Sequence, residues 1–271
     1  MDVLTGAVTA GHRGVGVIVP YDFALDREVW RWAPDAVDLY LTRTRNLPLR
    51  ADAEMARQIS TADTLRVGTR DLVAVAPDVV LYLCTSGSFV RGVEGERRMC
   101  AAMRAAGARA AVTTSGALLD ALAHLGVRAV AVASPYVPDV AAHLDAYLSE
   151  AGIGVLAHRR LGLDQRIWQV PRRAVRELVL AADDDAAEAV FVSCTNVPTY
   201  DLIVELEDLL GKPVLSANQV SMWAALRRVD AAPPANRAAA VRAPGGRAGH
   251  ARLRVRGSFV TWPARLRAPG V

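Results

Sequence analysis

Short apolar, β-branched runs alternate along most of the chain with longer stretches in which apolar residues recur at helical spacing. The short runs are typical of buried strands, and the longer stretches are typical of helices that cover a sheet. Strands are predicted at 14–20, 38–44, 79–84, 110–115, 128–136, 153–158, 189–194 and 213–216. Helices are predicted at 26–32, 52–76, 93–106, 116–125, 138–151, 171–182 and 199–210. This βαβα order predicts an α/β fold whose parallel sheets carry helices on both faces.

The ends of the predicted strands repeat in the same order in the two halves of the chain. A strand that ends in Pro-Tyr precedes a strand that ends in Cys-Thr twice, first at 20 and 84 and then at 135 and 194. Chance is the alternative, because proline often ends strands and cysteine is common in cores. We predict a duplication: two pseudo-symmetric Rossmann-like lobes, at 1–115 and 116–230, with an active site between them. The last elements of the second lobe could cross back to the first.

The charge of the chain is unevenly distributed. The 271 residues carry a net charge of +4, yet the segment 231–271 contains eight arginines and no acidic residue. Residues 1–230 therefore hold 24 basic residues against 28 acidic ones. We expect the Arg-, Pro-, Gly- and Ala-rich tail at 231–271 to be disordered. A nucleic-acid partner for the body of the protein is not indicated.

Composition and motifs exclude several classes of protein. Hydrophobic residues make up 52% of the chain, which predicts a large core, but no stretch of about 18 apolar residues predicts a membrane span. Three cysteines and an N-terminus without a basic, signal-like region favour a cytoplasmic protein without a disulfide framework. The five histidines are scattered, and no dinucleotide- or phosphate-binding glycine motif is present. We therefore expect no metal and no cofactor, and a homo-oligomer remains open.

Two cysteines, Cys84 and Cys194, stand at the ends of apolar strands, one in each half. Ligands of open α/β sheets bind at the carboxyl ends of the strands, and a thiol beside a helix N-terminus is shifted toward thiolate. The hydroxyls, N–H groups and amide that follow each cysteine suit a carboxylate ligand. These residues are Thr85, Ser86, Gly87, Ser88, Thr195 and Asn196. Inert core thiols are the alternative, and Cys100, inside an amphipathic helix, is expected to be one.

Four segments resemble one enzyme superfamily. They are Cys-Thr-Ser-Gly at 84–87, Ser-Pro-Tyr at 134–136, Ser-Cys-Thr-Asn at 193–196 and the stretch at 216–227. Together they resemble the aspartate/glutamate racemase superfamily. Within it they are similar to the branch of maleate cis-trans isomerases and arylmalonate decarboxylases, which includes racemase-like proteins of ectoine utilisation. The resemblance runs from about Gly14 to Val229.

The resemblance implies a cofactor-independent enzyme that acts on a small carboxylate. It implies that Cys84 and Cys194 face each other across the cleft, and that in isomerases the first-half thiolate adds to the alkene to give a thioether. It further implies that decarboxylases of the branch keep only the second cysteine, so both thiols favour an isomerase or a racemase. The residues that would bind substrate are Pro20, Tyr21, Thr85, Ser86, Gly87, Tyr136, Thr195 and Asn196.

We therefore predict a cis-trans isomerase of a small unsaturated dicarboxylate, similar to maleate isomerase. A two-thiol racemase or epimerase and an enzyme similar to arylmalonate decarboxylase are the alternatives within enzymes. A non-catalytic binding protein that keeps the cleft is the alternative from another class.

The segment after the first strand departs from the pattern of the isomerases. They are expected to have small polar residues there, with an asparagine that binds a substrate carboxylate, whereas this chain has Pro-Tyr-Asp-Phe at 20–23. Asp22 would repel a carboxylate if it faced the site. We expect Asp22 to point away from the site and to cap the helix that follows.

Overall fold

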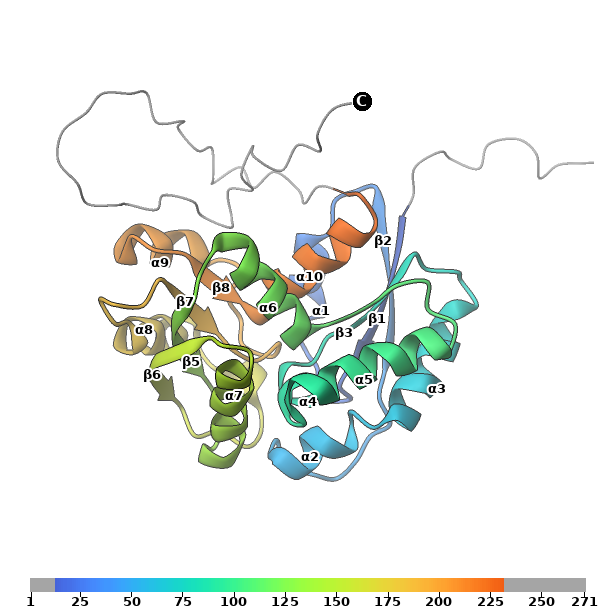
Figure 1. The fold of residues 1–271 in the computed structure, drawn as a ribbon, viewed down its shortest axis with the longest axis horizontal. Helices are drawn as coiled ribbons and strands as arrows, with labels where there is room; N and C mark the ends of the chain where they lie inside the picture. Colours follow the sequence, from blue (N-terminus) through green and yellow to red (C-terminus); the bar gives the residue numbers. More distant parts are fainter. Residues whose placement is uncertain (1–12, 232–271) are drawn as a thin grey trace, which may run out of the picture.

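The computed structural model describes residues 13–231, which form two lobes, each built on a four-stranded sheet (Figure 1). The first sheet has the order β2-β1-β3-β4, with β1 (Arg13–Val19), β2 (Val37–Arg43), β3 (Val79–Tyr82) and β4 (Ala111–Thr113). The second has the order β6-β5-β7-β8, with β5 (Ala129–Ser134), β6 (Gly154–Arg160), β7 (Ala189–Val192) and β8 (Val214–Ser216). All strand pairs within them are parallel. The equivalent strand orders confirm the predicted α/β fold with two pseudo-symmetric lobes.

Helices connect the strands and cover the sheets (Figure 1). Those of the first part of the chain are α1 (Asp26–Trp32), α2 (Ala53–Gln58), α3 (Ala62–Val73), α4 (Thr85–Phe89) and α5 (Gly92–Ala105). They are followed by α6 (Thr114–Leu125), α7 (Pro138–Glu150), α8 (Arg172–Ala182), α9 (Ile203–Leu210) and α10 (Ala217–Arg228), with a 3-10 turn at Ile167–Gln169. The central strands β3 and β7 are buried along their whole length, as expected for parallel strands covered on both faces.

The last described helix returns from the second sheet toward the first lobe. Helix α10 follows β8 but packs mainly against α6, and it also contacts α1 and β3. The lobe boundary predicted at 115/116 falls inside α6 and stays a prediction. The predicted disordered tail lies outside the described residues, except for Ala231.

The single helix predicted at 52–76 is two helices. Asp52 caps α2 by accepting a hydrogen bond from the N–H of Met55 (2.8 Å). The chain then breaks after α2, and Thr61 caps α3 by accepting from the N–H of Thr64 (3.2 Å). A threonine hydroxyl readily accepts a hydrogen bond from a free N–H group at the start of a helix. The helical spacing of apolar residues does not show this capping, so the break between the two helices was not predicted.

Hydrogen bonds from α1 hold the two lobes together. Glu28 of α1 accepts from the backbone N–H of Thr199 (3.0 Å), the Thr199 hydroxyl (2.9 Å) and the amide of Asn218 (3.0 Å). Arg31, one turn further along α1, lies over the ring of Tyr200 at 3.7 Å. These contacts fix the chain that follows β7 against the first lobe.

The turn after β3 depends on a glycine. Cys84 is the N-cap of α4, and its sulfur accepts a hydrogen bond from the N–H of Gly87 (3.4 Å). Tyr82, on the same strand face as Cys84, lies against this turn and donates its hydroxyl to the carbonyl of Ile59 (3.0 Å). A Cβ atom on Gly87 would lie 2.4 Å from the Tyr82 hydroxyl oxygen.

The turn after β7 differs from the turn after β3. No helix begins at Cys194; the next one, α9, starts at Ile203. Cys194 has a φ of 91°, in a region that L-residues rarely adopt. Such strain persists only where the surroundings hold it, and it is concentrated at functional sites.

We expect Gly87→Ala to lower the free energy of unfolding by about 1–3 kcal/mol, because the new methyl group overlaps the fully buried Tyr82. Gly154→Ala is the matched control, since its Cβ would meet no atom closer than 3.7 Å. Urea unfolding of the two variants measures the difference. Equal effects would show that the packing of Gly87 on Tyr82 does not constrain the turn.

We expect Cys194→Gly to be more stable than Cys194→Ala by about 1 kcal/mol, because glycine relieves the positive φ whereas alanine keeps it. The same pair at Cys84, where φ is −151°, should show the opposite order. Thermal and urea unfolding of the four variants test this. If Cys194→Ala is as stable as Cys194→Gly, or more stable, the backbone at residue 194 is not strained.

Candidate active site

Cys84 and Cys194 lie in one shared environment between the lobes. The charge of a Cys84 thiolate raises the pKa of Cys194, and both cysteines raise the pKa of Tyr136. Cys84 is 4% exposed, and Cys194 retains more exposed surface. The two strand ends that the sequence singles out therefore contribute to one place in the molecule, from opposite lobes.

Burial dominates the acidity of both thiols. It raises the pKa of Cys84 to about 11 and the pKa of Cys194 to about 12. At Cys84 the N–H of Gly87 and the hydroxyls of Tyr82 and Ser86 favour the thiolate, but they do not offset burial. The expected net shift toward thiolate is therefore wrong in sign, while Cys84 remains the more acidic thiol.

The hydroxyl of Tyr136 interacts with both cysteines. It accepts a hydrogen bond from the hydroxyl of Ser193 (3.2 Å) and favours the thiolate of Cys194. Thr85 is 1% exposed, and its hydroxyl oxygen has no hydrogen bond of good geometry with any of residues 13–231. Burial raises the pKa of Tyr136 and the Thr85 hydroxyl lowers it, so Thr85 presents its hydroxyl beside Tyr136.

The hydroxyls after Cys84 divide into two roles. The Ser86 hydroxyl lies 3.8 Å from the Cys84 sulfur, and Ser86 keeps some exposed surface. Ser88, in contrast, donates to the carbonyl of Cys84 (2.7 Å) and lies 2.7 Å from the hydroxyl of Ser115. Ser86 is therefore available to a ligand, whereas Ser88 builds the turn and its expected contact with an anion is not supported.

The residues after Cys194 tie the site to the first lobe. The Asn196 side chain donates to the carbonyl of Asp22 (3.2 Å) and accepts from the N–H of Ala24 (2.9 Å). Its backbone N–H stabilises the Cys194 thiolate. Thr195 is buried, and its carbonyl accepts from the amide of Asn218 (3.0 Å). The Asn196 amide thus makes a contact between lobes, and its expected contact with substrate stays a prediction.

Pro20 and Tyr21 begin a turn at the end of β1. The carbonyl of buried Pro20 accepts from the N–H of Phe23 (3.1 Å), and the N–H of Tyr21 donates to the Thr44 hydroxyl (3.1 Å). The Tyr21 hydroxyl donates to the carbonyl of Leu49 (3.2 Å). Pro20 therefore shapes the turn, and the hydroxyl of Tyr21 is engaged outside the group formed by Cys84, Cys194 and Tyr136.

Asp22 does not cap the helix that follows it. Helix α1 begins after Leu25 and has no side-chain cap. The Asp22 carboxylate instead raises the pKa of both Cys84 and Cys194. Burial also raises the pKa of Asp22 itself. The expectation that Asp22 caps α1 is therefore wrong, and the direction of its side chain stays a prediction.

Three further residues of this region were not predicted from the sequence, although the positions of two of them relative to the cysteines indicate their role. Tyr82 stands two residues before Cys84, which places both on one face of a strand. Ser193 precedes Cys194 directly and reaches Tyr136. Thr44, which holds the turn at Tyr21, comes from the end of the neighbouring strand β2, and only the sheet order reveals it.

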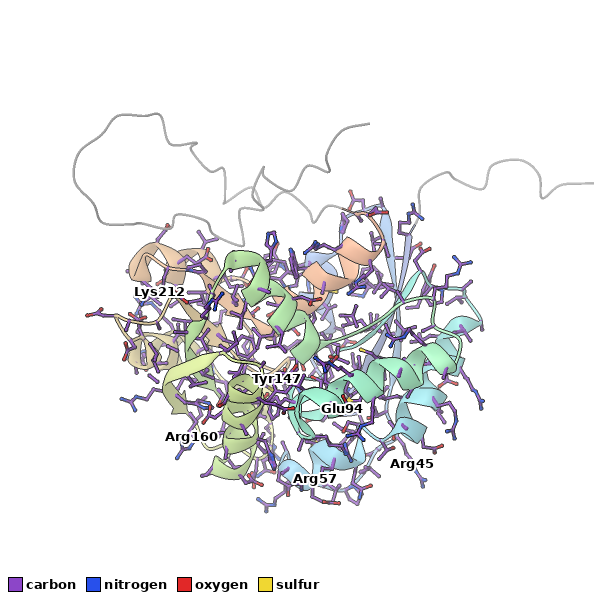
Figure 2. The ribbon with its side chains drawn as sticks, in the orientation of Figure 1. Arg45, Arg57, Glu94, Tyr147, Arg160 and Lys212 are labelled. Carbon is purple, nitrogen blue, oxygen red and sulfur yellow. The ribbon has the colours of Figure 1, made fainter. Side chains whose placement is uncertain are left out.

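Cys100 lies apart from this group, as expected. Its thiol donates to the carboxylate of Glu96 (3.2 Å), and burial with Glu96 raises its pKa. Burial raises the pKa of the hydroxyl of Tyr147, on α7 (Figure 2), and Glu96 and Cys100 raise it further. In residues 13–231 no group of histidine, cysteine and carboxylate side chains has the geometry of a metal site. Over the same residues, no helix is long and apolar enough to cross a bilayer.

A serine, a histidine and an aspartate form a chain beside Tyr136. The Ser134 hydroxyl lies 2.8 Å from His158 Nε2, and His158 Nδ1 lies 2.7 Å from the carboxylate of Asp145. Ser134 is fully buried, and its hydroxyl is engaged by His158. The chain joins β5, β6 and α7 and fixes the strand end that carries Tyr136.

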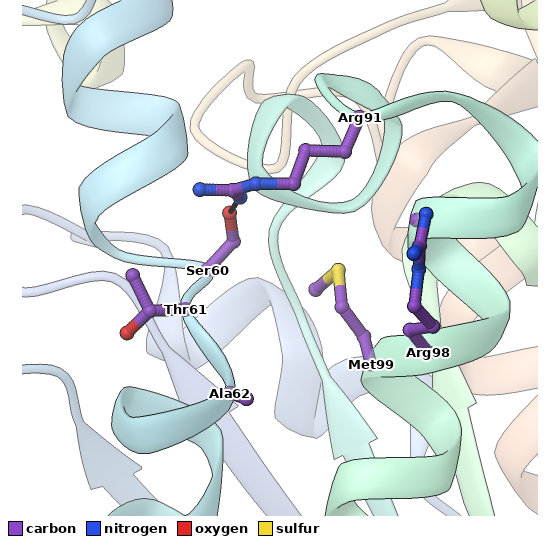
Figure 3. A pocket seen from close by; sticks show the side chains of 7 residues that line it. Ser60, Thr61, Ala62, Arg91, Arg98 and Met99 are labelled. Atoms are coloured by element: carbon purple, nitrogen blue, oxygen red, sulfur yellow. Dashed lines mark hydrogen bonds between the residues drawn. The ribbon is translucent and has the colours of Figure 1, made fainter.

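A surface hollow of about 290 Å³ lies between the start of α3 and helix α5 (Figure 3). Ser60, Thr61, Arg91 and Met99 are among the residues that line it. Arg91 donates to the hydroxyl of Ser60 (2.6 Å) across it. None of the predicted site residues lines this hollow, so it is separate from the two thiols.

The chain is similar to known enzymes. Over 153 residues the chain is 35% identical to arylmalonate decarboxylase of Bordetella bronchiseptica, which covers 55% of this chain and 64% of that protein, slightly less than two thirds. It is 29% identical over 168 residues to maleate isomerase of Nocardia farcinica, covering 59% of this chain and 67% of that protein.

Solved structures show the same fold. A liganded double variant of arylmalonate decarboxylase superposes with a TM-score of 0.74 at 28% identity, covering 80% of this chain and 92% of that one. A cysteine-to-serine variant of N. farcinica maleate cis-trans isomerase, which carries a covalently bound succinylcysteine intermediate, superposes with a TM-score of 0.74 at 24% identity, covering 82% and 94%. The sequence model of the arylmalonate decarboxylase family matches residues 52–241. The chain therefore belongs to the arylmalonate decarboxylase family, within the branch that also contains the maleate isomerases.

Proposed function

We propose that the protein is a cofactor-independent cis-trans isomerase of a small unsaturated dicarboxylate, or of a close derivative of one, and that it works with two opposed cysteines. The observation that carries this proposal is the shared environment of Cys84 and Cys194 around Tyr136. A single-thiol decarboxylase would need only one of them. The relatives named maleate isomerase and arylmalonate decarboxylase support a cysteine-dependent enzyme.

In the proposed reaction, Cys84 is the nucleophile and Cys194 moves the proton. The Cys84 thiolate adds to one alkene carbon, the π electrons move to the other carbon, and Cys194 delivers a proton there. The resulting thioether has a single bond about which the substrate rotates. The Cys194 thiolate then removes the proton, the C–S bond breaks, and the trans alkene leaves with both sulfurs in their starting states. No oxidant and no cofactor is consumed.

The donors around the thiols suit one substrate carboxylate. The hydroxyl of buried Thr85 acts on the hydroxyl of Tyr136, and the partly exposed Ser86 hydroxyl lies 3.8 Å from the Cys84 sulfur. When an anion enters a site closed to solvent, several hydroxyl groups that donate hydrogen bonds to it replace part of the water that it loses. We infer that this group holds the carboxylate next to the alkene carbon that accepts the proton.

Two other reactions use the same geometry and give different products. A racemase would exchange an α-proton for deuterium from solvent while keeping the carbon skeleton, and a decarboxylase would release carbon dioxide from a malonate. Proton NMR in deuterated buffer with maleate, an α-chiral acid and an arylmalonate separates the three. Conversion of a cis alkene to the trans alkene supports the proposal, and turnover of only one of the other two substrates would replace it.

We expect Cys84→Ser to lower kcat by at least about a thousandfold, because a serine hydroxyl is a far weaker nucleophile at the same position. Cys194→Ser should be similarly damaging, since a hydroxyl exchanges its proton poorly. Cys100→Ser, a matched change outside the site, should retain activity. Near-normal turnover by Cys84→Ser would rule out thiolate catalysis at this residue.

We expect activity to rise with pH across the neutral and mildly alkaline range. The pKa of Cys84 is raised to about 11, so the thiolate fraction grows about tenfold for each pH unit below that value. The pH profile of kcat/KM, and the rate at which iodoacetamide alkylates Cys84, should share this slope. A plateau reached already at neutral pH would show that the thiol is much more acidic than its burial indicates.

A further inference from the structure

The Glu28 carboxylate, on α1, reaches across the junction of the two lobes. Its Oε2 atom accepts a hydrogen bond from the backbone N–H of Thr199 (3.0 Å). Its Oε1 atom accepts from the hydroxyl of Thr199 (2.9 Å) and from the side-chain amide of Asn218 (3.0 Å). Thr199 and Asn218 are both buried. One carboxylate from the start of the chain therefore binds three donors from its second half.

The amide of Asn218 extends this contact to the residue after Cys194. Its nitrogen donates to Glu28 and also to the carbonyl of Thr195 (3.0 Å). A primary amide has two N–H groups, so one amide bridges the two oxygens. Asn218 is itself held in place, because it stands in the first turn of α10, whose start is closed by a capping box. Glu28 therefore acts on Thr195 through a rigid link.

The segment 195–199, which Glu28 holds at both ends, follows a strained residue. Cys194 has a φ of 91°, and such a conformation persists only where the surroundings hold it. Glu28 holds the segment at Thr199 directly and at Thr195 through Asn218. Hydrogen bonds to an ionised carboxylate are about twice as strong as bonds between neutral groups. The charge of Glu28 thus suits it to keep this backbone in place.

Cys84 is held by different bonds. Its sulfur accepts from the N–H of Gly87 (3.4 Å), and its carbonyl accepts from the hydroxyl of Ser88 (2.7 Å). Both donors belong to the turn that Cys84 itself begins. A change at Glu28 should therefore act on Cys194 and spare Cys84.

We propose that Glu28 is a positioning residue for Cys194. Through Thr199 and Asn218, its carboxylate keeps the strained backbone at residue 194 in the conformation that presents the thiol to substrate. The inference rests on the proposed isomerase function for what Cys194 does with its proton, but the positioning itself is testable without any substrate. Glu28 acts only through these neighbours and takes no part in the bond changes.

The experiment is a double-mutant cycle on stability. Urea unfolding gives the difference in free energy of unfolding between Cys194→Gly and Cys194→Ala, first alone and then each combined with Glu28→Gln. Glutamine keeps the shape of glutamate, but its NH₂ group is a donor and cannot accept the bonds of the oxygen that it replaces. If Glu28 holds the strained backbone, the advantage of glycine over alanine should fall by at least about half in the Glu28→Gln background. Glu28→Asp, which keeps the charge, should preserve more of it.

Glu188→Gln is the matched control. Glu188 also accepts hydrogen bonds from backbone N–H groups, those of Arg128 and Ala129, but at the start of β5, whereas the thiols stand at strand ends. Its loss should leave the difference at residue 194 unchanged. Asn218→Ala, which removes the link to Thr195, should reduce that difference and serves if Glu28→Gln does not fold. An unchanged difference in either background, or no advantage of glycine at 194 in the otherwise wild-type protein, would overturn the inference.

Turnover gives a second readout, which a purely structural role would not produce. If maleate is isomerised, Glu28→Gln should lower kcat at least about tenfold and change KM less than about threefold, because proton transfer by Cys194 slows while substrate binding is kept. Glu188→Gln should retain both constants, and an equal loss of kcat in the two variants would count against the positioning of Cys194. If no alkene is isomerised, only the proposed function fails, and the stability cycle still decides the role of Glu28.

Discussion

The candidate site depends on one side-chain amide that joins the lobes. Asn196, two residues beyond Cys194, donates to the carbonyl of Asp22 and accepts from the N–H of Ala24. These bonds hold the turn after β1 against the turn after β7. The ends of two strands from different sheets therefore keep fixed positions relative to each other. Glu28, which binds the backbone and hydroxyl of Thr199, secures the same junction a few residues further along. A pair of thiols can share one substrate only if their lobes are held in this way.

The duplication gives the lobes equal topology and their cysteines unequal surroundings. Cys84 starts a helix and receives an N–H bond from Gly87 over the buried ring of Tyr82. Cys194 starts no helix and holds a strained backbone, with a φ of 91°. Burial raises the pKa of both. This asymmetry is the physical basis for giving the two thiols different roles.

The sequence predicts the architecture well because alternating strands and helices leave strong periodic patterns. It also places Cys84, Cys194, Tyr136 and Thr85, whose positions follow directly from strand ends. It fails where tertiary contacts decide the outcome. The Asn196 amide turns to the opposite lobe, the Tyr21 hydroxyl binds the carbonyl of Leu49, and Asp22 does not cap α1 although its spacing suits a helix cap. The net acidity of the thiols depends on how deeply they are buried, which strand patterns do not reveal.

The most direct test of the central claim, that Cys84 attacks a substrate held between two thiols, is to trap the adduct. The Cys194→Ser variant is incubated with maleate, quenched, and measured by intact-protein mass spectrometry and peptide mapping. We expect a mass increase equal to one molecule of the added alkene, located on Cys84, and none in Cys84→Ser. Turnover by the wild-type protein without any adduct on Cys84 in Cys194→Ser, or an adduct on Cys100 alone, would contradict the account.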